Sequence, residues 1–237
     1  MKKIIALILA LCCVFAVVSC NGDAPEEVDG VKEFTRLYSV SAPTRVETSY
    51  TALLGTVPLK GSQTLVTGSL SDGREATQLT YSYYKLQDVA SGAGSVITPI
   101  IGKDPISGSR EYVKGEGERY NGGAWDAAGM NFAPKAGSIA IKLDETKIKD
   151  VVYSENGGKK TLSFTVEADN TSDVLGEGYE VLSDVSVVIT ADSAVITGIT
   201  ISYTADVEAK KGVKYPAAKI TMATSYTYGI EIVTLVK

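Results

Sequence analysis

Three carboxylates are the first residues whose types and spacing suggest chemistry. Glu116 and Glu118 stand two residues apart in an expected strand, and Asp126 follows the next turn. Side chains two residues apart in a strand point to the same face, and glycoside hydrolysis uses a pair of carboxyl groups. Exposed glutamates on the wet face of a strand are a commoner arrangement. We favour that interpretation and expect no hydrolase site here.

Other catalytic patterns are incomplete. The chain has no histidine, which excludes Ser-His-Asp sites, Cys-His sites and His-ligated zinc. Ser82 and Lys85 spell S-x-x-K, but the run is strand-like and the SDN and KTG elements that accompany this pattern are missing. Residues 169–173 carry oxygens that suit calcium, but they lack the glycine and distal glutamate of an EF-hand. We expect no enzyme activity, no cofactor and no metal ion.

The first twenty residues have the layout of an export signal. Lys2 and Lys3 precede an unbroken apolar run, residues 4–18. As a helix this run would be ~22 Å long, too short for the ~30 Å hydrocarbon core of a bilayer. The run ends in V-V-S-C, which resembles the bacterial lipobox. That resemblance implies cleavage before Cys20, a diacylglyceryl group on its thiol, and acylation of the new N-terminus, typically with palmitate.

The expected processing divides the N-terminal region into two parts. Residues 1–19 would be a signal peptide, and residues 20–30 a lipidated cysteine with a flexible tether. An ordinary cleavable signal with an incidental cysteine is the alternative. The acidic tether also resembles a surface-export signal of some outer-membrane bacteria, although we favour a plain tether. The predicted location is the cell envelope, lipid-anchored and extracytoplasmic, at the outer face of the plasma membrane or at the outer membrane.

Net charge limits the classes of binding partner, and cysteine content limits the disulfides that the folded part can form. The chain has 23 basic and 28 acidic residues; without Lys2 and Lys3 the balance is 21 against 28, a net charge of −7. Nucleic acids and anionic membrane surfaces attract clustered Lys and Arg, so we expect neither as an electrostatic partner. Cys12 and Cys13 lie in the expected signal peptide, which leaves no disulfide for the folded part. Residues 31–237 are expected to form a single β-rich domain.

Periodicity predicts one helix followed by a large sheet. Apolar residues recur at helical spacing over residues 31–40, whereas residues 44–54 fit either a second helix or a first strand. Strict alternation marks strands with one dry and one wet face; it occurs in residues 161–166, 195–207 and 219–228. Val195 is expected on the dry face. The predicted fold is α+β and mainly β: a large curved antiparallel sheet (a half-open barrel) with a few short helices.

Apolar side chains and tyrosines suggest a ligand cavity. Isoleucines crowd residues 97–106, which is unusual for a free surface loop, and tyrosine combines an apolar ring with a polar tip. A wide sheet can enclose more volume than its side chains fill, and residues 97–106 would act as its lid. The candidate lining residues are Leu79, Tyr81, Tyr83, Ile97, Ile100, Ile101, Phe164, Val187, Ile199, Ile201, Tyr203 and Met222. A filled core with a loop docked over it explains the same residues equally well.

The order of these features resembles the lipoprotein-carrier (Lol) superfamily of half-open barrels. A lipidated cysteine, a short linker, an N-terminal helix and a long antiparallel meander recur there, and the mycobacterial glycolipid-carrier lipoproteins of the LppX/LprG type share the plan. The resemblance spans about residues 31–230 and implies that acyl chains are cupped between sheet and helices. It predicts a non-catalytic, membrane-anchored envelope lipoprotein that binds or carries a lipid or other hydrophobic ligand.

A surface interaction module is the alternative function. Exposed loops such as residues 121–125 would then bind glycan or protein, and Trp125 could stack on a sugar, although we favour it as a cap on the core. The two functions differ in what the core should contain. A continuous apolar hollow above ~300 Å³ favours the carrier, whereas a filled core with an aromatic loop patch favours the interaction module.

Overall fold

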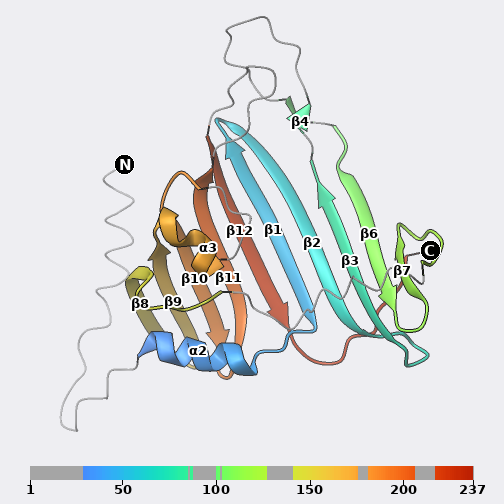
Figure 1. The fold of residues 1–237 in the computed structure, drawn as a ribbon, viewed down its shortest axis with the longest axis horizontal. Coiled ribbons are helices and arrows are strands. Elements are labelled where there is room, and N and C mark those ends of the chain that lie inside the picture. Colours follow the sequence, from blue (N-terminus) through green and yellow to red (C-terminus); the bar gives the residue numbers. More distant parts are fainter. Residues whose placement is uncertain are drawn as a thin grey trace, which may run out of the picture.

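Ten antiparallel strands form one open, twisted sheet in the computed structural model of the chain (Figure 1). The structure describes residues 29–84, 86–87, 100–101, 103–126, 141–175, 181–205 and 217–236. The strand order is β7-β6-β3-β2-β1-β12-β11-β10-β9-β8, and a separate pair joins β4 to β5. The predicted fold class is confirmed: the domain is mainly β, its sheet is not closed, and short helices lie against it.

The strands and helices have these bounds. The first half of the sheet contains β1 (Arg45–Leu54), β2 (Val57–Ser69), β3 (Glu75–Tyr83), β6 (Ile106–Val113) and β7 (Gly117–Tyr120). The second half contains β8 (Ile148–Asn156), β9 (Lys159–Val166), β10 (Val185–Asp192), β11 (Val195–Ala205) and β12 (Ala218–Thr227). The remaining elements are α2 (Gly30–Val40), β4 (Leu86–Gln87), β5 (Ile100–Ile101), η1 (Ala168–Asn170) and α3 (Thr171–Leu175).

β1 lies in the middle of the sheet because the chain builds it from two meanders. The first meander grows from β1 through β2, β3 and β6 to β7, at one edge. The chain then crosses to the other edge and returns through β8, β9, β10 and β11 to β12, which pairs with β1 from Arg45↔Thr227 to Leu54↔Ala218. The two meanders therefore join along one long antiparallel seam, and the inner face of the sheet runs across it without a break.

Helix α2 begins and ends where its sequence supplies caps. The Asp29 carboxylate accepts hydrogen bonds from the backbone N–H groups of Val31 and Lys32, both at 3.1 Å, which satisfies donors that a helix start leaves unpaired. The Ser41 hydroxyl closes the other end by donating to the Leu37 carbonyl at 2.7 Å. Gly30 lets the helix approach the sheet, because a Cβ there would lie 2.6 Å from the Tyr153 Cβ. The predicted helix over residues 31–40 is confirmed.

The two halves of the sheet are covered on opposite faces. Helices α2 and α3 lie on the inner face of β8–β11 (Figure 1) and bury the larger core there, around Phe34 and Leu37. The C-terminal segment, residues 231–236, lies on the outer face of the other half. Its Val233 packs with Val66, Ala76 and Val113 in a second, smaller core. The inner face of β1, β2, β3 and β6 has no helix of the described chain upon it.

The structure decides two open alternatives and corrects two expectations. Residues 44–54, left open between helix and strand, contain strand β1. The register between β10 and β11 shifts after Thr190, so Ile196 is fully buried in the position expected for Val195. Ile106, expected in the lid, is a strand residue that pairs with Tyr83. Residues 169–173, for which the sequence allows a loop or a short helix, contribute to η1 and to the start of α3.

Both edges of the sheet are irregular. Edge strand β8 carries a bulge between Lys149 and Val152, and Asp150 has a φ of 54° there. Edge strand β7 is four residues long, and an isolated β-bridge joins its Glu118 to Asp126 along its free edge, away from β6. Among the described residues, no helix combines the length and apolarity needed to cross a membrane.

Candidate functional site

One register row of inner-facing side chains crosses nearly the whole sheet. Antiparallel partners share a face, so the pairings of seven strand interfaces place eight residues side by side. From β9 to β6 the row reads Phe164, Val187, Ile201, Met222, Tyr50, Gly61, Tyr83 and Ile106. The row is apolar throughout, with tyrosine replacing aliphatic residues beyond the central seam.

The covering of this row changes at the seam. Phe164, Val187 and Ile201 are buried in the core beneath α2. On the far side, Tyr83 is 45 % exposed and Ile106 41 % exposed. Gly61 has no side chain, so the backbone of β2 forms the floor between Tyr50 and Tyr83. Apolar surface that is core in one half of the sheet therefore continues into an uncovered surface of the described chain.

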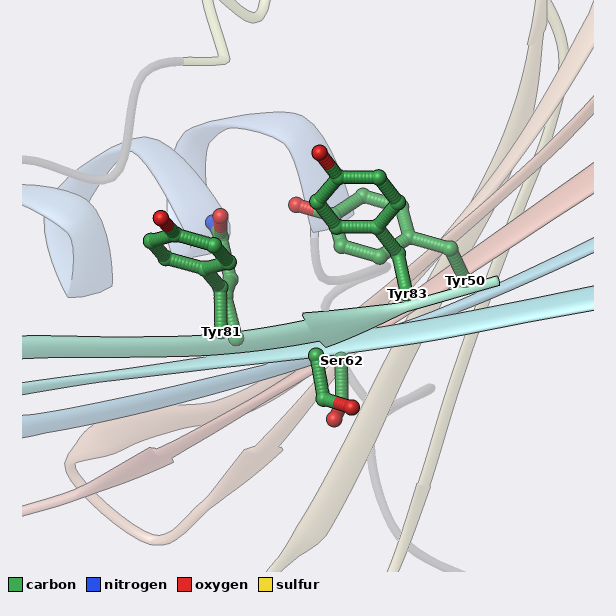
Figure 2. Close-up of a pocket in the computed structure, with 6 residues that line it drawn as sticks. Tyr50, Ser62, Tyr81 and Tyr83 are labelled. Carbon is green, nitrogen blue, oxygen red and sulfur yellow. The ribbon is translucent and has the colours of Figure 1, made fainter. Parts of the chain in front are cut away.

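We call this uncovered surface the tyrosine face and define it by Tyr50, Gly61, Gln63, Tyr81 and Tyr83. Figure 2 shows the three tyrosine rings rising from the side of the sheet on which α2 lies, whereas Ser62 points to the other side. The rings border an open depression of about 230 Å³. The rings of Tyr81 and Tyr83 are stacked, with centroids 6.2 Å apart and planes inclined by 27°. The surface is broad and aromatic rather than a closed hole.

Small residues make room for these rings. Gly108 is the partner of Tyr81 on β6, and a Cβ there would collide with the Tyr81 hydroxyl. The neighbouring Asn121 has a φ of 50°, and its side-chain oxygen accepts a hydrogen bond from the Ser109 N–H at 2.7 Å. The turn after β7 is thereby fixed beside the Tyr81 hydroxyl. The Asn121 turn is therefore part of the wall of the face.

Charge is nearly absent from the inner face next to the tyrosines. Arg110, one row further along β6, donates two hydrogen bonds to Glu118 at 3.0 and 3.1 Å. Tyr120 donates a third to the same carboxylate at 3.1 Å and lies under the guanidinium at 5.2 Å. Burial, followed by the hydrogen bond to Glu118, raises the pKa of the Tyr120 hydroxyl. The cation on this face is thus neutralised by a neighbour.

The carboxylates considered for hydrolysis are held by different partners. Glu118 is buried and bonded to Arg110, so the expectation that both glutamates are solvated is wrong for this one. Glu116 lies in the turn before β7 and pairs with Arg74. Asp126 meets Glu118 through backbone hydrogen bonds. Within the described residues, no group of three or more histidine, cysteine, aspartate or glutamate side chains is placed to hold a metal ion.

The opposite, outer face is polar at the same place. A depression of about 480 Å³ crosses β12, β1 and β2. Small polar side chains from these three strands contribute to it, among them Ser49, Ser62, Thr64 and Ser225. The sheet therefore separates an aromatic surface on one side from a hydroxyl-lined surface on the other.

The structure divides the predicted lining residues into groups. Leu79, Tyr81 and Tyr83 share the inner face of β3. The buried core beneath α2 takes in Phe164, Val187, Ile199 and Ile201, with Tyr203 and Met222 packed against it. Ile100 and Ile101 form β5, which pairs with β4; their side chains, like Ile97 and the proposed lipidation site Cys20, lie outside the described residues. The role of each as a ligand contact stays a prediction.

Sequence reasoning missed Tyr50, Gly61 and Gln63. Tyr50 lies in residues 44–54, whose sequence fits either a helix or a strand. As a strand, Val46, Thr48 and Tyr50 alternate onto one face, and this alternation is the signal that would have identified Tyr50. Gly61 and Gln63 carry no such signal, because only the β1–β2 register brings them beside it. The depression itself is smaller than the ~300 Å³ taken as the mark of a ligand cavity, so the candidate site is an open face.

Comparisons with known proteins give weak likenesses. No protein-family model matches the sequence, and no curated protein is similar enough to match. Solved structures with a partly similar arrangement include Rv2717c from M. tuberculosis, with 10% identity and a TM-score of 0.27 over 86% of this chain and 100% of that one. A DUF1329 family protein from Desulfovibrio piger has 9% identity and a TM-score of 0.24, covering 87% and 93%.

A third match is a domain named for outer membrane lipoprotein sorting, from Vibrio parahaemolyticus. It has 6% identity and a TM-score of 0.22, and the match covers 84% of this chain and 90% of that one. Values this low carry no argument about what the chain does. The fold described above rests on strand pairing and burial within this chain.

Proposed function

We propose that this chain is a membrane-anchored, non-catalytic envelope lipoprotein that binds a lipid or other hydrophobic ligand on its tyrosine face. The observation that carries the proposal is the register row described above. It is core in the half of the sheet covered by α2, and it continues through Met222, Tyr50 and Tyr83 onto a surface that no helix of the described chain covers. A hydrophobic ligand would extend the core across the seam.

The chemistry of the face suits an amphiphile. A tyrosine ring offers up to about 150–250 Å² of mostly apolar contact and keeps its hydroxyl available for water or a polar group. The ring pair of Tyr81 and Tyr83 is broad enough to lie along a chain of methylene groups. Each fully buried methylene contributes about 0.8 kcal/mol, so contact with the rings along an alkyl chain would supply several kcal/mol, from which the cost of immobilising the ligand is subtracted.

The anchor belongs to the same proposal. Cys20, in the lipobox-like V-V-S-C, would carry the acyl chains that hold the domain at the membrane. Two or more acyl chains give stable attachment, whereas a single chain gives marginal attachment. A binding face held at a membrane surface would meet amphiphiles at high local concentration. The expected place of action is therefore the extracytoplasmic side of the envelope.

A non-catalytic role is supported by the hydrogen bonds that buried carboxylates of the sheet already make within the fold. Glu111, fully buried, accepts hydrogen bonds from Gln78, Arg119 and the Val236 N–H. Glu118 is engaged by Arg110 as described. General acid–base catalysis needs a titratable group within reach of substrate, and these carboxylates are committed to neighbours within the fold.

Glycan or protein binding remains the second candidate, and the tyrosine rings favour its glycan form because flat aromatic rings also stack on sugars. The loop at residues 121–125 is less suitable for binding a glycan. Trp125 packs against the outer-face core, and the Arg119 guanidinium lies 4.6 Å from its ring centroid. The interpretation of Trp125 as a cap on the core is the one that fits these contacts.

Native mass spectrometry tests the proposal on a chain that begins at Asn21, which keeps every contact described here. We expect a co-purified or added hydrophobic molecule to bind one to one, and we expect the double substitution Tyr50→Ser and Tyr83→Ser to abolish that binding. Tyr84→Ser is the matched control, since Tyr84 neighbours Tyr83 but does not border the depression. A parent protein that takes up no hydrophobic molecule, or a double variant that binds like the parent, contradicts the proposal.

A further inference from the structure

We infer that the ligand of the tyrosine face is an amphiphile with an uncharged, hydrogen-bonding head group. This inference rests on the proposed function and narrows it to one chemical class. The observations that carry it are the distribution of charge between the two faces of the sheet and the polar row beside Gly61.

Inner-facing positions in β12, β1, β2, β3 and β6 are almost free of charge. Register and alternation place two charged residues among them, Arg110 and Glu75. Each has an opposite charge beside it: Arg110 pairs with Glu118, and Glu75, at the end of β3, pairs with Lys114. The outer-facing positions of the same strands carry Arg45, Glu47, Lys60, Glu111 and Lys219.

A charged head group would find no counter-charge among the described residues of this face that is not already paired with a neighbour. Placing an ion against apolar surface costs several kcal/mol unless it is paired and hydrogen-bonded. An anionic head would have to displace Glu118 from Arg110, and a cationic head would have to displace Arg110 from Glu118. Either exchange breaks two hydrogen bonds that the fold already makes. An uncharged head group incurs neither cost.

The row next to the apolar one supplies neutral hydrogen-bonding groups. It reads Thr224, Thr48, Gln63, Tyr81 and Gly108. The Thr48 and Thr224 hydroxyls bond to one another at 3.1 Å, whereas the Gln63 amide makes no hydrogen bond to the described part of the chain. Gln63 offers both a donor and an acceptor. Its partner Tyr81 adds a hydroxyl on the far side of the row, over Gly108. These are groups that hydrogen-bond hydroxyls or amides of a neutral head.

The apolar row has a separate place for the chain of the ligand. Gly61 leaves a gap between Tyr50 and Tyr83, which stand on strands separated by two inter-strand spacings, or about 9–10 Å. A Cβ at Gly61 would already lie 3.2 Å from the Tyr83 Cβ, so the alkyl chain of the ligand would lie above the backbone, between the rings. The ligand would then lie with its chain over Gly61 and its head over Gln63. Gly61 and Gln63 of this face would then each contact one part of the ligand.

Three probes with the same eight-carbon chain test the inference: octyl glucoside, octanoate and octyltrimethylammonium. Isothermal titration calorimetry below the critical micelle concentrations measures their binding to the chain that begins at Asn21. We expect octyl glucoside to bind at least about tenfold more tightly than either charged probe, with glucose alone not binding. Equal binding of all three, or tighter binding of a charged one, overturns the inference but leaves the proposed function. Binding of none overturns the proposed function as well.

Two substitutions test which residues contact the head group of the probe and which contact its alkyl chain. Gln63→Leu is expected to remove most of the preference for octyl glucoside, and Gly61→Val to weaken all three probes at least tenfold. Their controls, Thr64→Leu and Lys60→Val, are neighbouring residues on the outer side of β2 that do not border the depression, and they should change neither property. Thermal melts identify a variant that fails to fold; Gly61→Ala then replaces Gly61→Val. Retained preference in a folded Gln63→Leu protein contradicts the assignment of the head group.

Discussion

A single aspartate placed at two positions of one register row should destabilise the domain to very different extents. Ile201 is 7 % exposed beneath α2, whereas Tyr83, four strands away in the same row, is 45 % exposed. Ile201→Asp loses about 1.5–3 kcal/mol of apolar burial and buries a carboxylate at a further cost of several kcal/mol. The sum is comparable with the whole stability of a domain, about 5–15 kcal/mol. We expect this variant to be largely unfolded.

Tyr83→Asp leaves its carboxylate in water and removes part of one ring contact, so we expect a loss of about 1 kcal/mol. With a denaturant slope of about 2 kcal/mol/M, this lowers the urea midpoint by about 0.5 M. Circular dichroism during urea titration measures both variants. Equal destabilisation by the two aspartates would refute the reasoning, because it would mean that the row is as well covered at Tyr83 as at Ile201.

Matched controls lie on the outer face. Thr200→Asp, next to Ile201 on β11, should cost no more than about 1 kcal/mol, because its side chain points away from the core. The same contrast is expected between Phe164→Asp, which should unfold the domain, and Thr165→Asp, which should not. A Thr200→Asp or Thr165→Asp variant that fails to fold would show that both faces of this half are covered.

The remaining predictions concern the anchor, the helix and the tail. Cys20→Ser should abolish globomycin-sensitive processing and the recovery of the protein in the membrane fraction. Unchanged partitioning between membrane and soluble fractions would contradict the lipidation proposal. Hydrogen bonds from Arg36, and then from Lys160, lower the pKa of Glu33 from 4.5 to about 2, so its stabilising effect is complete above pH 4.5 and is lost as pH falls towards 2. Glu33→Gln should therefore cost about 1 kcal/mol at pH 7 after allowance for solvent screening, and little at pH 2, by urea titration. Glu111→Gln should cost about 2–3 kcal/mol by the same assay and speed amide exchange at the C-terminal segment; unchanged exchange would contradict its role in holding that segment.

Local patterns account for what could be predicted from the sequence. Helix α2 follows from its spacing of apolar residues, and Leu162, Phe164 and Val166 alternate inward as expected. The turn between β8 and β9 was recognisable from N-G-G, and both of its glycines, Gly157 and Gly158, have positive φ. These features depend on neighbours within a few residues, where propensity and periodicity act.

The site depended on pairings that no local pattern contains. The β1–β12 seam joins residues more than 160 positions apart, and it alone brings Tyr50 beside Met222. The bulge after Thr190, which exchanges Val195 for Ile196, is a property of two strands rather than of one. The tyrosines of β3 were found because their alternation is local, whereas the floor at Gly61 was not, because a glycine has no side chain to alternate.

The irregular edges of the sheet affect how readily copies of the protein associate with one another. An open sheet exposes unpaired N–H and C=O groups along its outermost strands, and these can recruit strands of another copy into a growing fibril. The positive φ at Asp150 and the bulge around it twist β8 out of the straight ladder that such recruitment needs. At the other edge, the Asp126 bridge occupies hydrogen-bonding groups of Glu118. Both edges are therefore poor templates for strands of another copy, and we expect the open sheet to resist polymerisation along its sides where copies are crowded together.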